Sequence, residues 1–174
     1  MKSKKIMSAN KWETGHIDPW WDLSFKNLNY QYYPLKNTHD LVRWINEGYH
    51  HLNLNGELYS MPNPMPELAN KFFMLFPWKN VSIAFYKMNT CDALPMHSDS
   101  YTSYTKRFGV ESIDVCRAVV FLENWCSGHY FEIDGKPLMP WKAGDYVHWN
   151  HDVPHFAGNF GVQPRYTVQI TGHL

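Results

Sequence analysis

The sequence predicts an α+β fold in which N-terminal helices pack on strands that close into a barrel or jelly roll. Three observations predict it. The chain has 174 residues, which is enough for one hydrophobic core but not for two ordinary ones. Helical spacing of apolar residues occurs only before residue 80, whereas short β-branched and aromatic segments follow it. Aromatic residues make up 17% of the chain, and their burial offsets the entropy lost on folding.

We expect a single domain built from two parts, residues 1–79 and residues 80–174. No linker rich in glycine, serine or proline separates them, and no internal repeat is visible. The first part begins with an aromatic and irregular segment, residues 1–36. Because its periodicity is weak, we predict an extended arm or edge strands that are held by their rings.

Two helices are predicted to follow the aromatic segment. The first is capped by Asn37 or Thr38 and runs to about Leu52. The second runs over Met65–Phe76, with Pro66 near its first position and a proline directly after its end. The apolar residues of the first helix are spaced for one face: Leu41, Val42, Trp44, Ile45 and Tyr49.

The second part reads as a series of short strands separated by turns. Turn residues occur at Asn124 to Gly128, at Asp134-Gly135 and at Ala143-Gly144-Asp145. The length of this region fits a small double-stranded β-helix, which is a cupin-like jelly roll. The predicted strands are Val81–Met88, Arg117–Leu122, His129–Ile133, Asp145–Trp149 and Arg165–Thr171.

Charge and cysteine content exclude several classes of protein. Sixteen Lys and Arg residues balance sixteen Asp and Glu residues, so no global field draws the chain to duplex nucleic acid or to an acidic membrane. The three cysteines, Cys91, Cys116 and Cys126, form no C-x-x-C pair, which argues against a disulfide scaffold or a zinc-thiolate site. Neither a signal peptide nor an apolar run of membrane-spanning length is present, and we expect a cytoplasmic protein.

The first candidate for chemistry is His97-Ser98-Asp99. Residues i and i+2 of an extended segment point to the same side, so this imidazole and this carboxylate can bind one divalent metal. With one more distant histidine they would complete the two-histidine, one-carboxylate set that is diagnostic of non-haem Fe(II) oxygenases. The alternative is a polar turn in which Asp99 caps its own backbone.

The second candidate is the last predicted strand. Arg165, Thr167 and Gln169 share one of its faces. If that face points inward, the guanidinium needs a partner, because an unpaired buried charge is very costly. A bidentate carboxylate ligand would supply the partner, with the Thr167 hydroxyl as a further donor. The alternative is that Arg165 lies on the solvated face or pairs with an acidic residue of the chain.

Taken together, the two candidates resemble the Fe(II)/2-oxoglutarate-dependent oxygenases. H-x-D, then a distant histidine, then an R-x-T strand ten residues after His155, is the order found in that superfamily. Phe85 to Thr171 look like its double-stranded β-helix core. The segment from Arg117 to His155 is similar to the aspartyl/asparaginyl β-hydroxylase branch, although that branch usually has glycine where this chain has Asp99.

The resemblance implies a role for seven residues. His97, Asp99 and His155 would bind iron, and Arg165 with Thr167 would hold the distal carboxylate of 2-oxoglutarate. Tyr86 falls near a position whose hydroxyl contacts this cosubstrate. Arg117 matches an arginine that opens a core strand and touches cosubstrate or substrate. For these last two, ordinary barrel residues are the alternative.

Three histidines compete to be the distal ligand. His148 lies within a predicted strand beside a tryptophan, a setting typical of packed or surface residues. The ten residues between His155 and Arg165 let the chain turn once and return, so His155 is favoured and His151 is the reserve. A structural zinc bound by His148, His151 and His155 is a further alternative, but a fourth ligand at the usual spacing is missing.

The resemblance also implies the reaction. An enzyme of this kind uses Fe(II), dioxygen and 2-oxoglutarate, forms succinate, and hydroxylates an unactivated C–H bond. By analogy we expect the substrate to be a peptide or protein side chain or an amino acid. The loop Ser98–Ile113, which carries Tyr101, Tyr104, Lys106 and Arg107, would cover the iron and bind an anionic or peptide substrate; the alternative is a solvated loop.

Two other classes of function compete with the oxygenase. A cupin-type barrel would bind a metal or small ligand without oxidising anything, as an isomerase or a binding module. Its usual signature is H-x-H followed closely by glutamate, whereas here Asp99 follows His97 and the next glutamate is Glu111. An interaction module with a degenerate site would be expected to have lost a ligand or the arginine, and this chain has all four.

Overall fold

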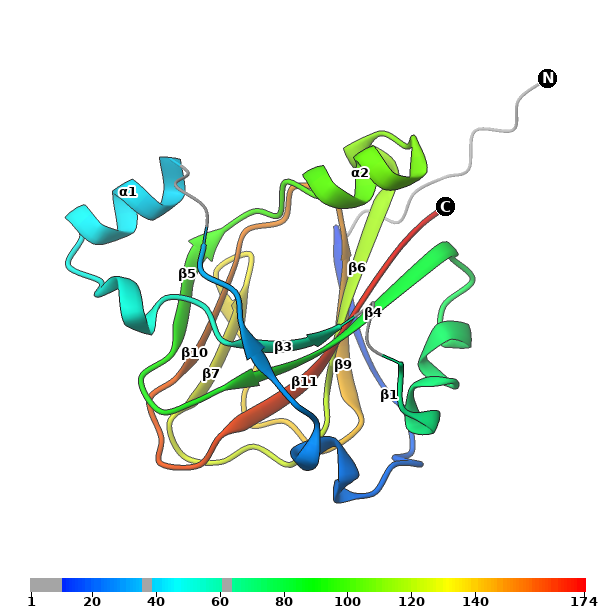
Figure 1. Cartoon of the computed structure of the whole chain (residues 1–174), viewed down its shortest axis with the longest axis horizontal. Coiled ribbons are helices and arrows are strands. Elements are labelled where there is room, and N and C mark those ends of the chain that lie inside the picture. The colour runs from blue at the N-terminus through cyan, green and yellow to red at the C-terminus, as the bar shows by residue number, and fades with distance from the viewer. Residues whose placement is uncertain (1–10, 36–38, 61–63) are drawn as a thin grey trace.

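The computed structural model describes residues 11–35, 39–60 and 64–174, whose strands form two antiparallel sheets (Figure 1). The larger has the strand order β1-β9-β6-β11-β4-β3-β2, and the smaller has the order β5-β10-β7-β8. The strands are β1 (Trp12–His16), β2 (Gln31–Tyr32), β3 (Glu57–Ser60), β4 (Lys79–Met88), β5 (Ala93–His97), β6 (Val115–Phe121), β7 (His129–Ile133), β8 (Lys136–Pro137), β9 (Asp145–Asn150), β10 (His155–Asn159) and β11 (Arg165–His173).

Helices are few in the described residues. The α-helices are α1 (His39–Asn46) and α2 (Thr102–Phe108). The 3₁₀ turns are η1 (Leu23–Asn27), η2 (His51–Asn53), η3 (Glu67–Ala69), η4 (Phe72–Met74) and η5 (Ser112–Asp114). Two facing antiparallel sheets with sequence-distant strands as neighbours make a jelly roll, so the predicted double-stranded β-helix fold is confirmed. The helices described here are too short and too polar to cross a membrane.

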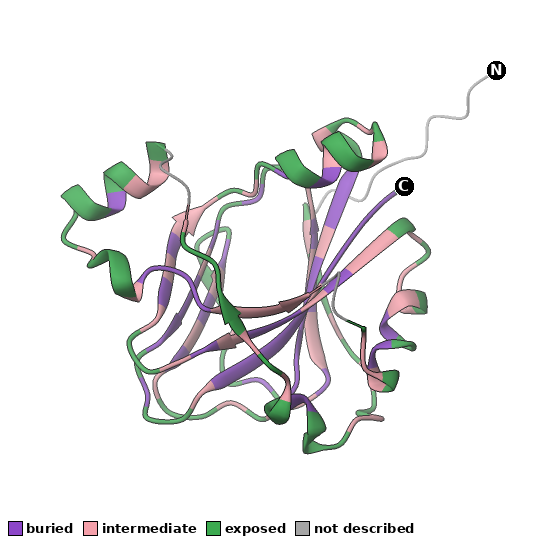
Figure 2. Ribbon diagram, viewed as in Figure 1, coloured by how far each residue is buried: buried purple, intermediate pink, exposed green. Residues whose placement is uncertain are grey.

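The strand β11 shows how the sequence gives the larger sheet two different faces. Tyr166, Val168 and Ile170 point outward into an apolar cluster, and Arg165 and Thr167 point inward. In register, Thr167 lies between Tyr86 of β4 and Phe121 of β6. The alternation of a β-strand therefore places the predicted R-x-T face inside the barrel, and Figure 2 shows β11 buried along most of its length.

The aromatic N-terminal segment supplies both edge strands of the larger sheet. β1 pairs with β9 at one edge, and β2 pairs with β3 at the other. Between them, the rings of Trp20 and Trp21 pack on Phe72, whose ring contacts Phe85 of β4. The outer face of the sheet is therefore closed by side chains from the first part of the chain.

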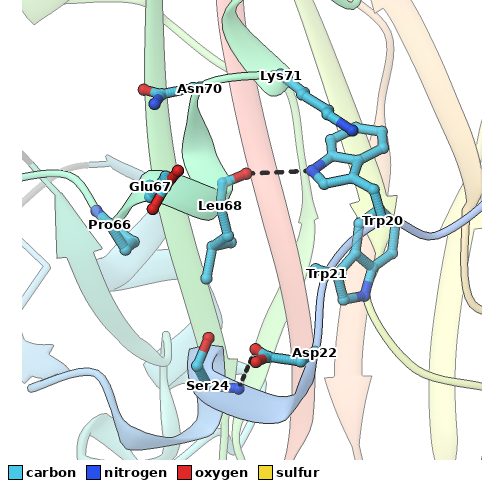
Figure 3. Close-up of a pocket in the computed structure, with 9 residues that line it drawn as sticks. All are labelled: Trp20, Trp21, Asp22, Ser24, Pro66, Glu67, Leu68, Asn70 and Lys71. Atoms are coloured by element: carbon cyan, nitrogen blue, oxygen red, sulfur yellow. Dashed lines mark hydrogen bonds between the residues drawn. The ribbon is translucent and has the colours of Figure 1, made fainter.

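A surface hollow of about 510 Å³ opens beside this aromatic cover (Figure 3). Several of its polar groups contact one another. The Trp20 indole donates to the carbonyl of Leu68 at 3.2 Å, and Asp22 accepts from the backbone N–H of Ser24 at 2.9 Å. The Lys71 ammonium lies over the Trp20 ring, 5.5 Å from its centre.

The first predicted helix is shorter than expected. α1 ends at Asn46, because Gly48 with φ +99° closes it and the backbone then continues to the separate turn η2. The proposed caps Asn37 and Thr38 lie outside the described residues. The expected apolar face is also wrong in part, because only Trp44 is buried while Val42 and Ile45 remain about half exposed.

The second predicted helix, Met65–Phe76, is wrong in type. The segment forms the two 3₁₀ turns η3 and η4 instead of an α-helix. Ala69 and Phe72 are both fully buried against the sheet and stand three residues apart. Residues three apart lie on one face of a 3₁₀ turn and of an α-helix alike, so the spacing of these two side chains does not distinguish the two structures.

Three strands of the smaller sheet were not predicted, and two of them, β5 and β10, carry both histidines of the candidate site. β5 contains Pro95 and β10 contains Gly158, and both residue types are unfavourable in strands. Pro95 is tolerated because β5 is the edge strand of its sheet. The five strands that the sequence predicted are all present, each extended or shifted by no more than a few residues.

Candidate metal centre and adjoining cavity

His97, Asp99 and His155 come together between the two strands β5 and β10. His97 ends β5, His155 begins β10, and the antiparallel register pairs these two residues directly. Asp99 follows in the next loop, with carboxylate oxygens 3.8 Å from His97 Nε2 and 3.9 Å from His155 Nε2. One ligand atom from each residue lies within 4.8 Å of the others. The three side chains can therefore share one metal ion.

Backbone carbonyls fix the orientation of both imidazoles. Nδ1 of His97 lies 2.7 Å from the carbonyl of Pro95, and Nδ1 of His155 lies 3.0 Å from the carbonyl of Val153. A carbonyl only accepts, so each Nδ1 must carry the hydrogen and each Nε2 keeps a free lone pair. Both Nε2 atoms face Asp99. Fixing the tautomer through the other ring nitrogen is how proteins orient metal-binding histidines.

The protonation states of the buried residues also suit metal binding. Burial, with a smaller contribution from the neighbouring His97, lowers the pKa of His155 to about 4, so the ring is neutral near pH 7. Burial alone would raise the pKa of Asp99, but Arg117 and the two histidines outweigh it and the net pKa is lowered. Two neutral imidazoles and one carboxylate are the donor set that Fe(II) takes in non-haem oxygenases, and these residues fit it.

A cavity of about 150 Å³ opens beside this group. Ligand pockets for drug-sized molecules measure roughly 300–1,000 Å³, so this cavity suits a smaller molecule. Residues from both sheets line it, including Asn55, Phe131, Trp149 and Gln169. All seven residues that the sequence singled out also line it: His97, Asp99, His155, Arg165, Thr167, Tyr86 and Arg117.

Arg165 lies at this cavity without an anionic partner. Arg165 is only 3% exposed, and no carboxylate of the described residues forms a salt bridge with it. Nη1 contacts only the sulfur of Met88 at 2.8 Å, and Nε has no hydrogen-bond partner. Burial lowers its pKa to about 10, so the guanidinium is still charged at neutral pH. A buried charge of this kind calls for an anionic ligand.

Tyr86 and Thr167 stand beside each other on the cavity wall. Their backbones are paired in register, and both side chains are almost completely buried. The Tyr86 hydroxyl donates to Asn55 Oδ1 at 2.6 Å, and burial raises its pKa. Tyr86 is therefore a neutral phenol. Asn55, which holds it, was not predicted, because nothing in the local sequence marks that asparagine.

Arg117 joins the metal group to the rest of the cavity. Its Nε lies 3.5 Å from Asp99 Oδ2, and its Nη1 donates to Gln169 Oε1 at 2.9 Å. The guanidinium also lies over the Tyr101 ring, 5.4 Å from its centre. Arg117 thus keeps Asp99 anionic and oriented, which an ordinary barrel residue would not do.

Trp44 is a second residue of the site that sequence reasoning missed. It belongs to α1, yet its ring meets His97 edge to face with the centroids 5.9 Å apart. Its indole nitrogen is buried and has no hydrogen-bond partner. The apolar spacing of α1 marked Trp44 only as a packing residue, because helical periodicity does not show what the helix packs against.

The competing histidines lie elsewhere. His148 points to the outer face of β9, where its ring meets Phe76 and its Nε2 lies 3.6 Å from Glu13 Oε2. His151 sits in the turn after β9. In the described part of the chain, the side chains that gather closely enough to bind a metal are His97, Asp99 and His155. The alternative zinc group of His148, His151 and His155 is therefore not assembled.

Neither models of known protein families nor curated proteins match this sequence. Among solved structures, a Pseudomonas putida prolyl-4-hydroxylase has a TM-score of 0.60 with 15% identity, over 95% of this chain and 93% of that one. A cupin domain from Schizosaccharomyces pombe has a TM-score of 0.42 with 10% identity, over 73% and 74% of the two chains. At this identity the first match shows a shared fold. The chain is thus a double-stranded β-helix protein with a candidate His-Asp-His metal centre.

Proposed function

We propose that this protein is an Fe(II)- and 2-oxoglutarate-dependent dioxygenase that hydroxylates an unactivated C–H bond. One observation carries the proposal. The buried guanidinium of Arg165, which has no carboxylate partner among the described residues, lines the same cavity as His97, Asp99 and His155. A metal-binding group and an unsatisfied cation facing one small cavity fit a cosubstrate that has a chelating end and a free carboxylate.

Each residue of the cavity has a distinct task in this proposal. His97, Asp99 and His155 would hold the iron, which with 2-oxoglutarate and dioxygen supplies the oxidising chemistry that yields succinate and the hydroxylated product. Arg165 would clamp the distal carboxylate, with the Thr167 hydroxyl as a neutral donor and the Tyr86 side chain, held by Asn55, beside it. Together they would fix the cosubstrate in one orientation at the metal.

The apolar wall of the cavity excludes water from the reacting atoms. Phe121, Phe131 and Trp141 surround the Arg165 guanidinium, with ring centres 5.9, 5.7 and 5.7 Å away. The Trp149 ring packs against His155 at 4.7 Å. In such a low-dielectric setting, the attraction between the guanidinium and a bound carboxylate is stronger than in water.

For the substrate, we propose a peptide or protein side chain or an amino acid in the cytoplasm. This part rests on the sequence resemblance to the aspartyl/asparaginyl β-hydroxylase branch and on fold-level analogy. A cupin-type metal protein with no oxidative activity, such as an isomerase, is the second candidate. It is favoured by the metal group alone, and it leaves Arg165 without a function.

Anaerobic titration with Fe(II) and then 2-oxoglutarate separates the two candidates. The oxygenase is expected to develop a weak visible charge-transfer band and, once air is admitted, to form succinate. His97→Ala should lose metal binding and the band together, whereas Arg165→Ala should keep metal binding and need more 2-oxoglutarate to reach the same band. A protein that binds zinc tightly but gives neither band nor succinate would contradict the proposal.

A further inference from the structure

A second cavity, of about 210 Å³, adjoins the first. The two share the side chains of Arg117 and Gln169, so they meet at the residue that contacts Asp99. The chemistry of the two differs, since the second has no aromatic residue in its wall. Its polar lining consists of Ser60, Ser82, Arg107, Arg117, Gln169 and Thr171.

The register of the larger sheet explains why these residues gather. Thr171 of β11 lies between Ser82 of β4 and Arg117 of β6. Ser60 of β3 pairs with Ala84, the next inward residue of β4. These side chains are small, except for the arginine, so the inner face of the sheet is hollowed here. In the same strands, the large side chains Tyr86 and Phe121 fill the space around Thr167.

Helix α2 adds the second arginine. It begins just after Asp99, and its Tyr104 hydroxyl donates to the carbonyls of Lys79 and Asn80, at 3.2 and 3.0 Å. These bonds fix the helix to the start of β4, and Figure 1 shows α2 at the end of the sheet where β6 begins. Arg107, in the last turn of α2, therefore borders the cavity while Lys106 beside it does not.

The charges of this second cavity do not cancel. Arg107 forms no salt bridge with a described residue, and the carboxylate beside Arg117 is Asp99. No Asp or Glu of the described residues lines this cavity. Two guanidinium groups against one carboxylate leave one positive charge, with hydroxyl and amide donors around it. A single carboxylate matches this charge, whereas a phosphate carries ~1.5–2 negative charges at neutral pH.

We propose that the second cavity is the substrate pocket and that the substrate carries a carboxylate bound between Arg107 and Arg117. The inference rests on the proposed function, and it narrows the substrate to an acid. A carboxylate held between these two arginines anchors the substrate next to Asp99. The substrate carbon atoms next to that carboxylate then face the metal group. The carboxylate can be the terminal group of an amino acid or peptide, or an acidic side chain.

Ligand-observed NMR on the protein with metal and saturating 2-oxoglutarate, kept anaerobic, tests this proposal. Three sets of probes distinguish the sources. N-acetyl amino acids carry a terminal carboxylate, their amides carry none, and N-acetyl-aspartate and N-acetyl-glutamate amides carry only the side-chain acid. At least one acid is expected to bind at least ~10-fold more tightly than its neutral amide, since a charge-assisted hydrogen bond is stronger than a neutral one.

Two neighbouring substitutions give a matched control. Arg107→Gln and Lys106→Gln each remove one positive charge from α2, but only Arg107 lines the cavity. Arg107→Gln should weaken the acid by roughly 10-fold, Arg107→Lys should restore part of the affinity, and Lys106→Gln should change little. The band given by Fe(II) and 2-oxoglutarate should be the same in all three variants.

Four results would overturn the proposal: acids and amides that bind equally, no binding by any acid, equal effects of the two glutamine variants, or inorganic phosphate that binds more tightly than every carboxylate. The charge-transfer band distinguishes this failure from failure of the proposed function. If the band forms and the acids do not bind, only the substrate assignment is wrong. If the band does not form, the oxygenase itself is wrong.

Discussion

The two faces of the larger sheet are made by the same strands but satisfy their polar groups differently. On the outer face, the indole nitrogens of Trp20 and Trp21 donate to the carbonyls of Leu68 and Leu122. On the inner side, buried polar atoms without a hydrogen-bond partner gather around the metal group and its cavity. They are Nε of Arg165, Nε of Arg117, the Tyr101 hydroxyl and the indole nitrogen of Trp44, which packs on His97.

This difference separates the residues that stabilise the fold from those that serve the site. Native proteins leave few buried polar groups unpaired, because each one costs free energy of folding. Of these groups, Arg165 lines the cavity and has no carboxylate partner among the described residues, so it indicates a ligand that completes it. On the outer face the indole nitrogens of Trp20 and Trp21 are paired, and the aromatic residues contribute stability through burial and through contacts between their rings.

The largest effect on stability is expected from the outer face. Phe72→Ala removes a fully buried ring that packs on Trp20, Trp21 and Phe85, and it should lower the free energy of unfolding by ~3–5 kcal/mol. Urea denaturation measures this loss. The affinity of the folded variant for Fe(II) and 2-oxoglutarate should remain that of the wild type; a changed affinity would show that the two faces are coupled.

A comparison of two histidines tests the inner face. His155→Ala removes a proposed metal ligand. Loss of a residue that only orients a ligand lowers metal affinity by ~10–100-fold, so loss of the ligand itself should lower metal affinity by more than that. His148→Ala removes the same ring from the outer side of β9, where it meets Phe76 and Glu13. Metal titration should show no change for this control. Equal losses in both variants would remove the distinction between the faces.

Arg165→Met should separate function from stability. Burial lowers the pKa of Arg165 from its ordinary value to about 10, so keeping the buried charge costs ~3 kcal/mol at neutral pH. The variant should therefore unfold at an equal or higher urea concentration, while its affinity for 2-oxoglutarate falls at least ~10-fold. A variant that is clearly less stable would indicate that Arg165 is structural.

The smallest effect concerns pH. Burial lowers the pKa of His129, a buried residue of β7, below its ordinary value near 6.5. The unfolded chain therefore takes up a proton at a higher pH than the folded one, and stability falls as the pH drops below about 6.5. His129→Gln, which can still donate to the carbonyl of Gln163, should make the unfolding free energy less dependent on pH. An unchanged pH profile would exclude His129 as its source.

Much of the fold was predictable because local pattern decides it. Alternation along Arg165–Thr171 follows directly from the geometry of a strand, and it placed Arg165 and Thr167 on one face. The structure shows that this face points inward. The turn at Asp134-Gly135 was also predictable, since both residues adopt the positive φ that these residue types tolerate. The second helix was wrong, because its apolar spacing fits a 3₁₀ turn against a sheet as well as it fits an α-helix.

By itself, the sequence determined which residue types are present and in what order: H-x-D, a later histidine and an R-x-T strand. Only the tertiary structure decided that β5 and β10 pair His97 with His155, that the charge of Arg165 is left without a carboxylate, and that Trp44 packs on the metal group. It also decided that Arg107 and Arg117 border one cavity. The physical reason is the distance along the chain between the contacting residues. Periodicity shows which face of its own helix or strand a residue occupies. These contacts join segments far apart in the chain, and the packing of the sheets decides which residues meet.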